Sequence, residues 1–233
     1  MDTLNAAWGL MTGFDPALMA IVGLSLRVSL SAVFLGLVIG SPLGAALAIW
    51  DFPGKQVLVV ISNAMMALPP VVVGLGVYVL LSRAGPLGEL GLLFTPTAMI
   101  IAQTVLITPI IMALTREAVM PLRRDYQNLM ISLDVGPLLQ LKTLLWDARF
   151  GVTTAVLAGF GRAIAEVGAV LIVGGNINGL TRVMTTTIAL ETSKGNLELA
   201  LALGIVLISI AIFVNAVIYF VGQIGRQYQE AVR

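Results

Sequence analysis

The sequence predicts an all-α integral membrane protein with about five transmembrane helices. Of its 233 residues, 58% are hydrophobic and only 11% are charged, and the mean hydropathy is +1.01. A soluble domain carries about 25% charged residues, so this chain has too few charges to cover a water-facing surface. It also contains long uncharged stretches, and a helix needs roughly 20 apolar residues to cross the hydrocarbon core of a bilayer.

Five segments fit such a crossing, and we expect the whole chain, residues 1–233, to form one transmembrane domain. The second segment is interrupted by Pro69-Pro70, and the fourth carries Arg162 and Glu166. For the first helix, an earlier start near Ala17 is also open. The predicted spans are residues 28–50, 56–82, 95–115, 152–173 and 199–225.

Basic residues are divided unequally between the two sides that these spans define. One side carries Lys55, Arg116, Arg123, Arg124, Lys142, Arg149, Arg226 and Arg233. The other carries only Arg27, Arg83, Arg182 and Lys194. The positive-inside rule makes the first side cytoplasmic, which places the N-terminus outside and the C-terminus inside.

Composition excludes several functions. The chain has no Cys and no His, which removes disulfides, thiolate chemistry and His-ligated metals. It has no G-x-x-x-x-G-K-[ST] loop, so we expect ATP to bind only to another chain. A net charge of +1 predicts no nucleic-acid partner. The first fifteen residues lack the features of a cleavable signal peptide, so the first apolar segment is expected to remain as an anchor.

Small residues at four-residue spacing predict close helix packing. Gly36, Gly40 and Gly44 form a small-xxx-small face in the first span. Such faces let the backbones of two membrane helices approach each other.

The cytoplasmic loop contains a segment, residues 123–151, that mixes charges with regularly spaced apolar residues. From 125 to 133 the pattern predicts a short amphipathic helix whose apolar face includes Leu129, Met130 and Leu133. Gly136-Pro137 ends this helix, and a second one can follow. The apolar face could enter a groove on a soluble partner, or it could lie on the lipid surface.

This segment resembles the coupling region of ABC importer permeases, whose motif reads roughly E-A-A, three residues, G, and later L-P. In this chain Leu129 and Met130 replace the two alanines and Asp134 replaces the glycine. The resemblance implies a coupling helix that contacts an ATPase subunit. Its expected contact residues are Gln127, Leu129, Met130, Ser132, Leu133, Asp134 and Gly136.

Two further stretches resemble the oxyanion permeases of this group, which import molybdate, sulfate or tungstate. Residues 160–169 (FGRAIAEVGA) followed by 175–182 (GNINGLTR) are similar to F-A-R-x-x-G-E-F-G-A and N-I-P-G-x-T-R. Residues 68–74 (LPPVVVG) match L-P-P-V-V-x-G. Residues 182–186 with Glu191-Thr192 look most like the tungstate-type branch. The resemblance implies the type I ABC importer permease fold in a prokaryotic inner membrane.

The residues themselves allow two interpretations of this region. Arg162 lies roughly 15 Å into its span at 1.5 Å per residue, and Glu166 follows one turn later. The pair can brace the helix bundle, or Arg162 can attract an anion while Glu166 limits its affinity. Pro69-Pro70 can form a gate or only pack. Asn176 and Thr185 can hand an oxyanion onward, or can cap helix ends.

The resemblance also implies an assembly. We expect two copies of this chain, two cytoplasmic ATPases that bind ATP and Mg, and an outer oxyanion-binding protein; no cofactor is expected on this chain. A self-sufficient secondary transporter or channel would need intramembrane carboxylates, of which only Glu166 qualifies. An intramembrane enzyme is disfavoured by the missing His and Cys. A simple anchor is disfavoured by the buried charges.

Overall fold

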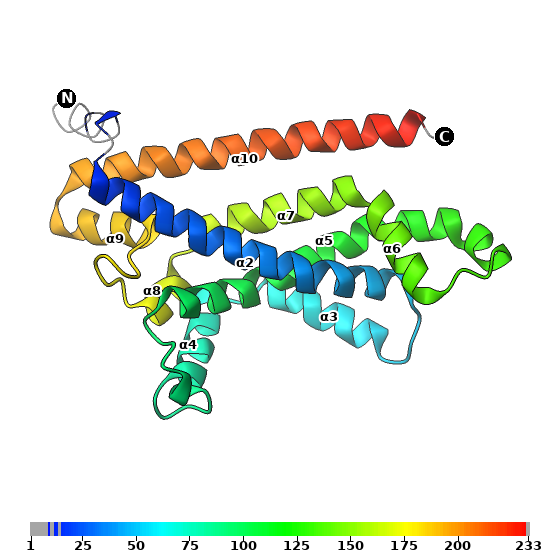
Figure 1. The fold of residues 1–233 in the computed structure, drawn as a ribbon, viewed down its shortest axis with the longest axis horizontal. Helices are drawn as coiled ribbons and strands as arrows, with labels where there is room; N and C mark the ends of the chain where they lie inside the picture. The colour runs from blue at the N-terminus through cyan, green and yellow to red at the C-terminus, as the bar shows by residue number, and fades with distance from the viewer. Residues whose placement is uncertain (1–8, 10–11, 14, 232–233) are drawn as a thin grey trace. The chain divides into compact units, whose positions relative to one another are not determined.

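The computed structural model describes residues 9, 12, 13 and 15–231, with backbone only from residue 225 onward. Arg233 and most of the first fifteen residues therefore lie outside the described residues. Within the described part every regular element is helical, as predicted. The helices are α2 (Pro16–Ile49), α3 (Lys55–Met66), α4 (Pro70–Leu81), η1 (Gly88–Leu90), α5 (Pro96–Ser132), α6 (Pro137–Asp147), α7 (Arg149–Ile164), α8 (Gly168–Gly174), α9 (Met184–Lys194) and α10 (Leu197–Ala231) (Figure 1).

Three helices are each long and apolar enough to cross a membrane: α2, α5 and α10. Two further pairs, α3 with α4 and α7 with α8, meet the same test only when each pair is taken as one broken span. The described residues therefore provide three crossings, or up to five if each pair counts as one. The second and fourth predicted spans are the two that the structure breaks.

The first helix begins earlier than residue 28. Oδ1 of Asp15 accepts hydrogen bonds from the backbone N–H groups of Ala17 and Leu18, both at 3.0 Å. An acidic N-cap followed by Pro at the first helical position is a strong helix start. The helix therefore starts at Pro16, close to the alternative start at Ala17, and Arg27 lies within it rather than before it.

The predicted separate helix over residues 125–133 is wrong. Helix α5 continues without interruption from Pro96 to Ser132 and includes both Pro109 and Pro121. The charges from Arg116 onward indicated the end of a membrane span, but charged residues do not end a helix. The break that follows, at Gly136-Pro137, is where the sequence placed it.

The chain forms two compact units. Unit 1 contains the described residues up to Ala32, Pro69–Val105 and Gly161–Phe213; unit 2 contains Val33–Leu68, Leu106–Phe160 and the described residues from Val214. Helices α2, α5, α7 and α10 contribute to both. Every predicted path residue falls in unit 1, and every predicted coupling residue falls in unit 2.

In unit 2 the glycine face of α2 packs against α5. A Cβ atom at Gly40 would lie 2.9 Å from the carbonyl oxygen of Thr108, and one at Gly44 would lie 2.2 Å from that of Met112. No side chain fits at such distances. The predicted close approach is confirmed, and its partner is the middle of α5.

In unit 1 the half-helices α4 and α8 lie side by side (Figure 1). A Cβ atom at Gly74 would lie 2.7 Å from Cα of Ala169, and one at Gly168 would lie 2.7 Å from Cγ2 of Val71. These contacts bring the start of α4, just after Pro69-Pro70, against the start of α8.

Candidate translocation site and coupling surface

The break between α7 and α8 is organised by Glu166. Its Oε2 lies 2.5 Å from Nη1 of Arg162 on the last turn of α7. Its Oε1 accepts a hydrogen bond of 3.2 Å from the backbone N–H of Ala169 at the start of α8. The first N–H groups of a helix have no partner within the helix, and a carboxylate is a favourable partner there. Glu166 therefore joins the two half-helices.

The two charged side chains differ in exposure. The Glu166 side chain is only 5% exposed, whereas that of Arg162 is 37% exposed. A buried carboxylate needs both a counter-charge and hydrogen bonds, and Glu166 has both. Arg162 supplies the counter-charge for Glu166, and its side chain remains partly exposed.

Side chains from two other elements satisfy the backbone around the break. Nε2 of Gln103, on α5, donates to the carbonyl oxygen of Ala163 at 3.0 Å. Oγ1 of Thr185, on α9, donates to the carbonyl oxygen of Glu166 at 2.7 Å. Helix breaks at membrane depth persist where protein groups replace the lost hydrogen bonds. Hydrogen bonds from α5 and α9 thus stabilise the break.

Thr185 is buried, and its hydroxyl proton is used within the fold. Its neighbours Thr186 and Thr187 both donate to the carbonyl oxygen of Val183. All three hydroxyl groups are therefore used within the fold, and for Thr185 this agrees with the structural alternative that the sequence left open.

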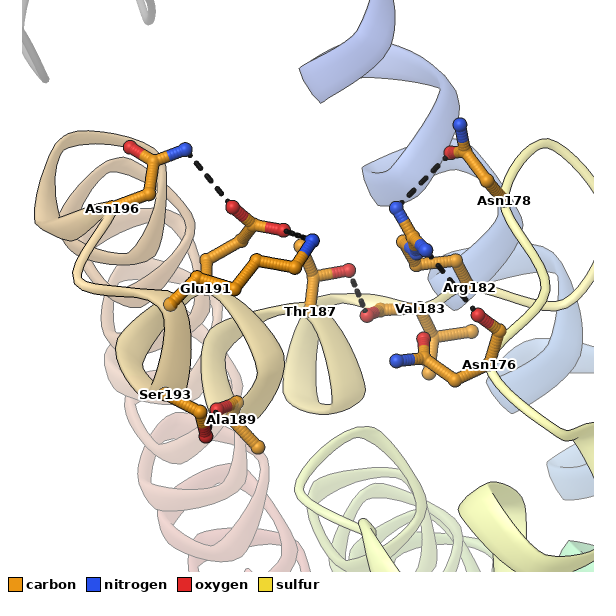
Figure 2. A network of polar contacts seen from close by, with 10 residues as sticks. Asn176, Asn178, Arg182, Val183, Thr187, Ala189, Glu191, Ser193 and Asn196 are labelled. Carbon is orange, nitrogen blue, oxygen red and sulfur yellow. Dashed lines mark hydrogen bonds and ion pairs between the residues drawn. The ribbon is translucent and has the colours of Figure 1, made fainter.

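Asn176 lies two residues beyond the end of α8, which is about 10 Å long at 1.5 Å per residue. Its φ of 51° is left-handed, and its Oδ1 is buried without a hydrogen-bond partner among the described residues. Its carbonyl oxygen accepts a 3.5 Å bond from Nη2 of Arg182, whose Nη1 binds Oδ1 of Asn178 at 3.2 Å (Figure 2). Asn176 belongs to this outer network and not to the break.

The outer network includes a buried carboxylate that the sequence did not single out for a role of its own. Oε1 of Glu191 lies 2.9 Å from Nζ of Lys194, and its Oε2 accepts from Nδ2 of Asn196 at 2.9 Å (Figure 2). The hydrogen bond from Lys194, and then that from Asn196, lowers the pKa of Glu191. The three groups tie the end of α9 to the start of α10.

In unit 2 the turn between α5 and α6 is a Schellman motif. The N–H of Val135 donates to the carbonyl oxygen of Met130 at 3.0 Å, and that of Asp134 donates to Ile131 at 3.1 Å. Asp134 has a φ of 46°, the left-handed conformation that this motif requires and that glycine adopts most easily. Asp134, which stands at the glycine position of the coupling motif, thus adopts a conformation that glycine favours. Gly136 and Pro137 then start α6.

The predicted apolar face of the coupling segment is only partly correct. Leu129 and Leu133 are exposed, the latter at 65%, whereas Met130 is 9% exposed. Met130 packs in the core of unit 2 with Val119 and Leu144. Met130 therefore holds the segment in place. Other exposed apolar side chains stand nearby in the chain, namely Ile131, Leu138, Leu139 and Trp146.

The remaining predicted coupling residues are polar or turn positions. Gln127 and Ser132 are exposed, and Oγ of Ser132 donates to the carbonyl oxygen of Asn128 at 2.8 Å. Exposed Leu, Ile and Trp side chains thus lie at the end of one helix and along the next, outside the predicted spans. We call Leu129, Ile131, Leu133, Leu138, Leu139 and Trp146 the coupling surface.

Residues 32–224 match the family described as the binding-protein-dependent transport system inner membrane component. The chain belongs to this family. The tungstate uptake system permease protein TupB of Peptoclostridium acidaminophilum is 41% identical to it over 94% of this chain and 96% of that protein. The protein of the same name in Campylobacter jejuni is 40% identical over 71% of this chain and 70% of that protein.

The fold of the permease is similar to that of a solved transporter. A chain of the MetNI methionine ABC transporter, solved in inward-facing conformations, matches with a TM-score of 0.63. The match covers 93% of this chain and 96% of that one, at 17% identity. The predicted type I ABC importer permease fold is confirmed. Family membership also establishes a multi-pass membrane permease that works with ATPase and solute-binding partners.

Among the predicted path residues, three lie at the break: Arg162, Glu166 and Thr185. Pro69 and Pro70 precede Val71 in the chain, and it is Val71 that lies close to Gly168. Sequence reasoning did not identify Gln103 as part of this region. The available signal was a single Gln in the uncharged third span, because a buried amide in a membrane helix must find a hydrogen-bond partner.

Proposed function

We propose that this permease subunit carries tungstate across the cytoplasmic membrane into the cell, driven by ATP hydrolysis on partner chains. The observation that carries the proposal is the likeness, over nearly the whole length of both chains, to a permease named for tungstate uptake. The alternatives are molybdate and sulfate, because all three are tetrahedral dianions. We expect the chain itself to hydrolyse no ATP and to bind no cofactor.

The geometry of the break supports different roles for its two charged side chains, Arg162 and Glu166. Glu166 is buried and fixed by Ala169, so it serves as a brace. The exposed part of Arg162 provides positive charge that a dianion can approach. Because Glu166 remains 2.5 Å away, it offsets part of that charge. A path must bind its cargo weakly enough to release it.

The coupling surface supports the link to the ATPase. It presents large apolar side chains outside the predicted spans, and an apolar helix face can enter a groove on a partner. Met130 and the Schellman turn fix this surface to unit 2. A movement of the ATPase would then be passed on to α5 and α6 as a rigid displacement.

We further propose that two copies pair with twofold symmetry, with the N-terminus outside. The absence of Cys from the sequence makes this orientation directly testable. A single Cys in place of exposed Lys142 should react with an impermeant maleimide only in inside-out vesicles. One in place of Lys194, whose side chain is 53% exposed, should react only in right-side-out vesicles. The reverse pattern would overturn the orientation.

Substrate identity is tested by competition. The permease is reconstituted with its ATPase and solute-binding protein, and uptake of labelled tungstate is measured against excess molybdate or sulfate. We expect tungstate uptake to resist a tenfold excess of sulfate. Uptake of molybdate or sulfate without uptake of tungstate would assign the subunit to the alternative substrate.

A further inference from the structure

Unit 2 contains a cavity of about 310 Å³ that gathers positive charge. Four basic side chains line it, Lys55, Arg116, Arg123 and Arg124, and the one acidic side chain in the lining is Asp51. Its volume is at the small end of the range for ligand pockets, which begins at about 300 Å³. A space of this kind suits a small anion.

Asp51 offsets only part of this charge. Its Oδ1 lies 2.8 Å from Nζ of Lys55, and its Oδ2 lies 2.5 Å from Nη2 of Arg123. Nη1 of Arg123 also donates to the carbonyl oxygen of Ala48 at 3.0 Å. Lys55 and Arg123 are thus held in fixed positions, and four cations with one carboxylate leave a formal charge of +3.

The other two cations have no counter-charge within the described residues. Neither Arg116 nor Arg124 forms an ion pair there, and the acidic residues next to them in the chain, Glu117 and Asp125, do not line the cavity. Nε of Arg116 is buried without a hydrogen-bond partner. A buried charged donor without an acceptor is costly, so native proteins rarely leave one unmatched. A cleft lined by charges of one sign attracts counter-ions, so the unpaired charges of Arg116 and Arg124 favour an anion in this cavity.

The position of the cavity indicates where the ligand comes from. It opens beside the end of α2, and Trp50, the residue after that helix, is 38% exposed. Trp is enriched at the boundary between the hydrocarbon core and water. Under the proposed orientation the cavity lies on the cytoplasmic side, where basic pockets between transmembrane helices bind lipid headgroups. The planar fork of Arg suits phosphate oxygens.

We propose that the cavity binds one phosphate-class tetrahedral anion, held by Arg116 and Arg124 with Lys55 and Arg123. The position at the membrane boundary favours the headgroup phosphate of an anionic phospholipid. A free oxyanion in the cytoplasm shares the same chemistry and is the second possible source.

The test uses the full-length permease in detergent and native mass spectrometry. The protein is titrated with phosphatidylglycerol and, separately, with phosphatidylcholine. We expect one phosphatidylglycerol to bind more tightly than phosphatidylcholine. Arg116→Gln and Arg124→Gln should each weaken that binding about fivefold, the factor that corresponds to about 1 kcal/mol per basic residue. Lys142→Gln, which removes an exposed charge outside the cavity, should leave it unchanged. Thermal unfolding checks that each variant is folded.

Competition identifies the source of the anion. If millimolar inorganic phosphate or tungstate displaces the lipid, the cavity accepts free oxyanions; if neither does, the lipid headgroup is the ligand. Equal affinity for the two lipids with no binding of free anions would overturn the proposal. So would equal weakening by Lys142→Gln. Loss of ATPase co-purification in Arg124→Gln with unchanged lipid binding would show instead that these cations face the ATPase.

Discussion

Nη1 of Arg162 lies 2.5 Å from Oε2 of Glu166, where α7 ends and before α8 begins. The other oxygen of Glu166 binds the first turn of α8, so one ion pair and one helix cap share a single carboxylate. This arrangement explains how a charged pair persists in an apolar span. It also assigns Glu166 a structural contact that is distinct from the transport role we propose for Arg162.

Removing Arg162 alone should affect both stability and transport. Arg162→Gln leaves the carboxylate of Glu166 buried without its cation, which should lower the free energy of unfolding by about 1–3 kcal/mol. The double variant Arg162→Gln/Glu166→Gln removes both charges, and the new amide oxygen at position 166 can still accept from Ala169. We expect thermal stability to recover in the double variant and uptake to remain low. Recovery of both would show that the pair acts only as a brace.

The coupling surface and the core beneath it should respond differently to substitution. Leu129→Gln/Leu133→Gln alters only exposed side chains, so the stability should change by less than about 0.5 kcal/mol per site. Co-purification with the ATPase should nevertheless be lost. Met130→Ala should instead lower the free energy of unfolding by about 2 kcal/mol or more, because Met130 is buried. If the ATPase still binds the double variant, the coupling surface has been assigned to the wrong residues.

The turn after α5 stores backbone strain at Asp134. A left-handed conformation costs an L-residue about 1–2 kcal/mol relative to the right-handed one, and rather less for Asp. Asp134→Gly should therefore raise the free energy of unfolding by about 0.5 kcal/mol. Asp134→Val, which tolerates a positive φ poorly, should lower it. A lower melting temperature for the glycine variant would mean that the Asp134 side chain makes a contribution larger than the strain.

Glu191 should make stability depend on pH in the acid range. Its pKa is lowered in the folded state, first by Lys194 and then by Asn196, from an ordinary value of 4.5. Its contribution is therefore complete above about pH 4.5 and is lost as the pH falls through the lowered pKa. Wild type should exceed Glu191→Gln in melting temperature at pH 7, and the difference should shrink as the pH falls below about 4.5. A constant difference between pH 7 and pH 3 would contradict this role.

Composition and the length of the apolar segments predicted the membrane class, because both are properties of the whole chain, whereas the type I permease fold followed from the resemblance to oxyanion permeases. The glycine face of α2 could also be predicted, since Gly36, Gly40 and Gly44 at four-residue spacing indicate close packing of two membrane helices. The ends of the helices were harder to predict. Asp15-Pro16 marks a helix start by its capping chemistry, but a search for apolar residues passes over it.

Details that depend on tertiary contacts could not be predicted. Leu129 and Met130 are adjacent and similar in hydropathy, yet only Met130 has a core to enter. Arg162 and Glu166 fit one helix face at i and i+4, but this spacing does not reveal the break after α7, where Glu166 accepts a hydrogen bond from the first turn of α8. Arg116 and Arg124 counted only as basic residues in the sequence, and the cavity that they share with Lys55 comes from the fold.

The central claim is that this permease moves an oxyanion only when a separate ATPase drives it. Uptake of tungstate into proteoliposomes measures this directly, with the permease alone under an ion gradient and with its ATPase and solute-binding protein in the presence of ATP. We predict no uptake above background for the permease alone, and uptake that stops when ATP is replaced by a non-hydrolysable analogue. Gradient-driven uptake by the permease alone would contradict the account and identify a secondary transporter.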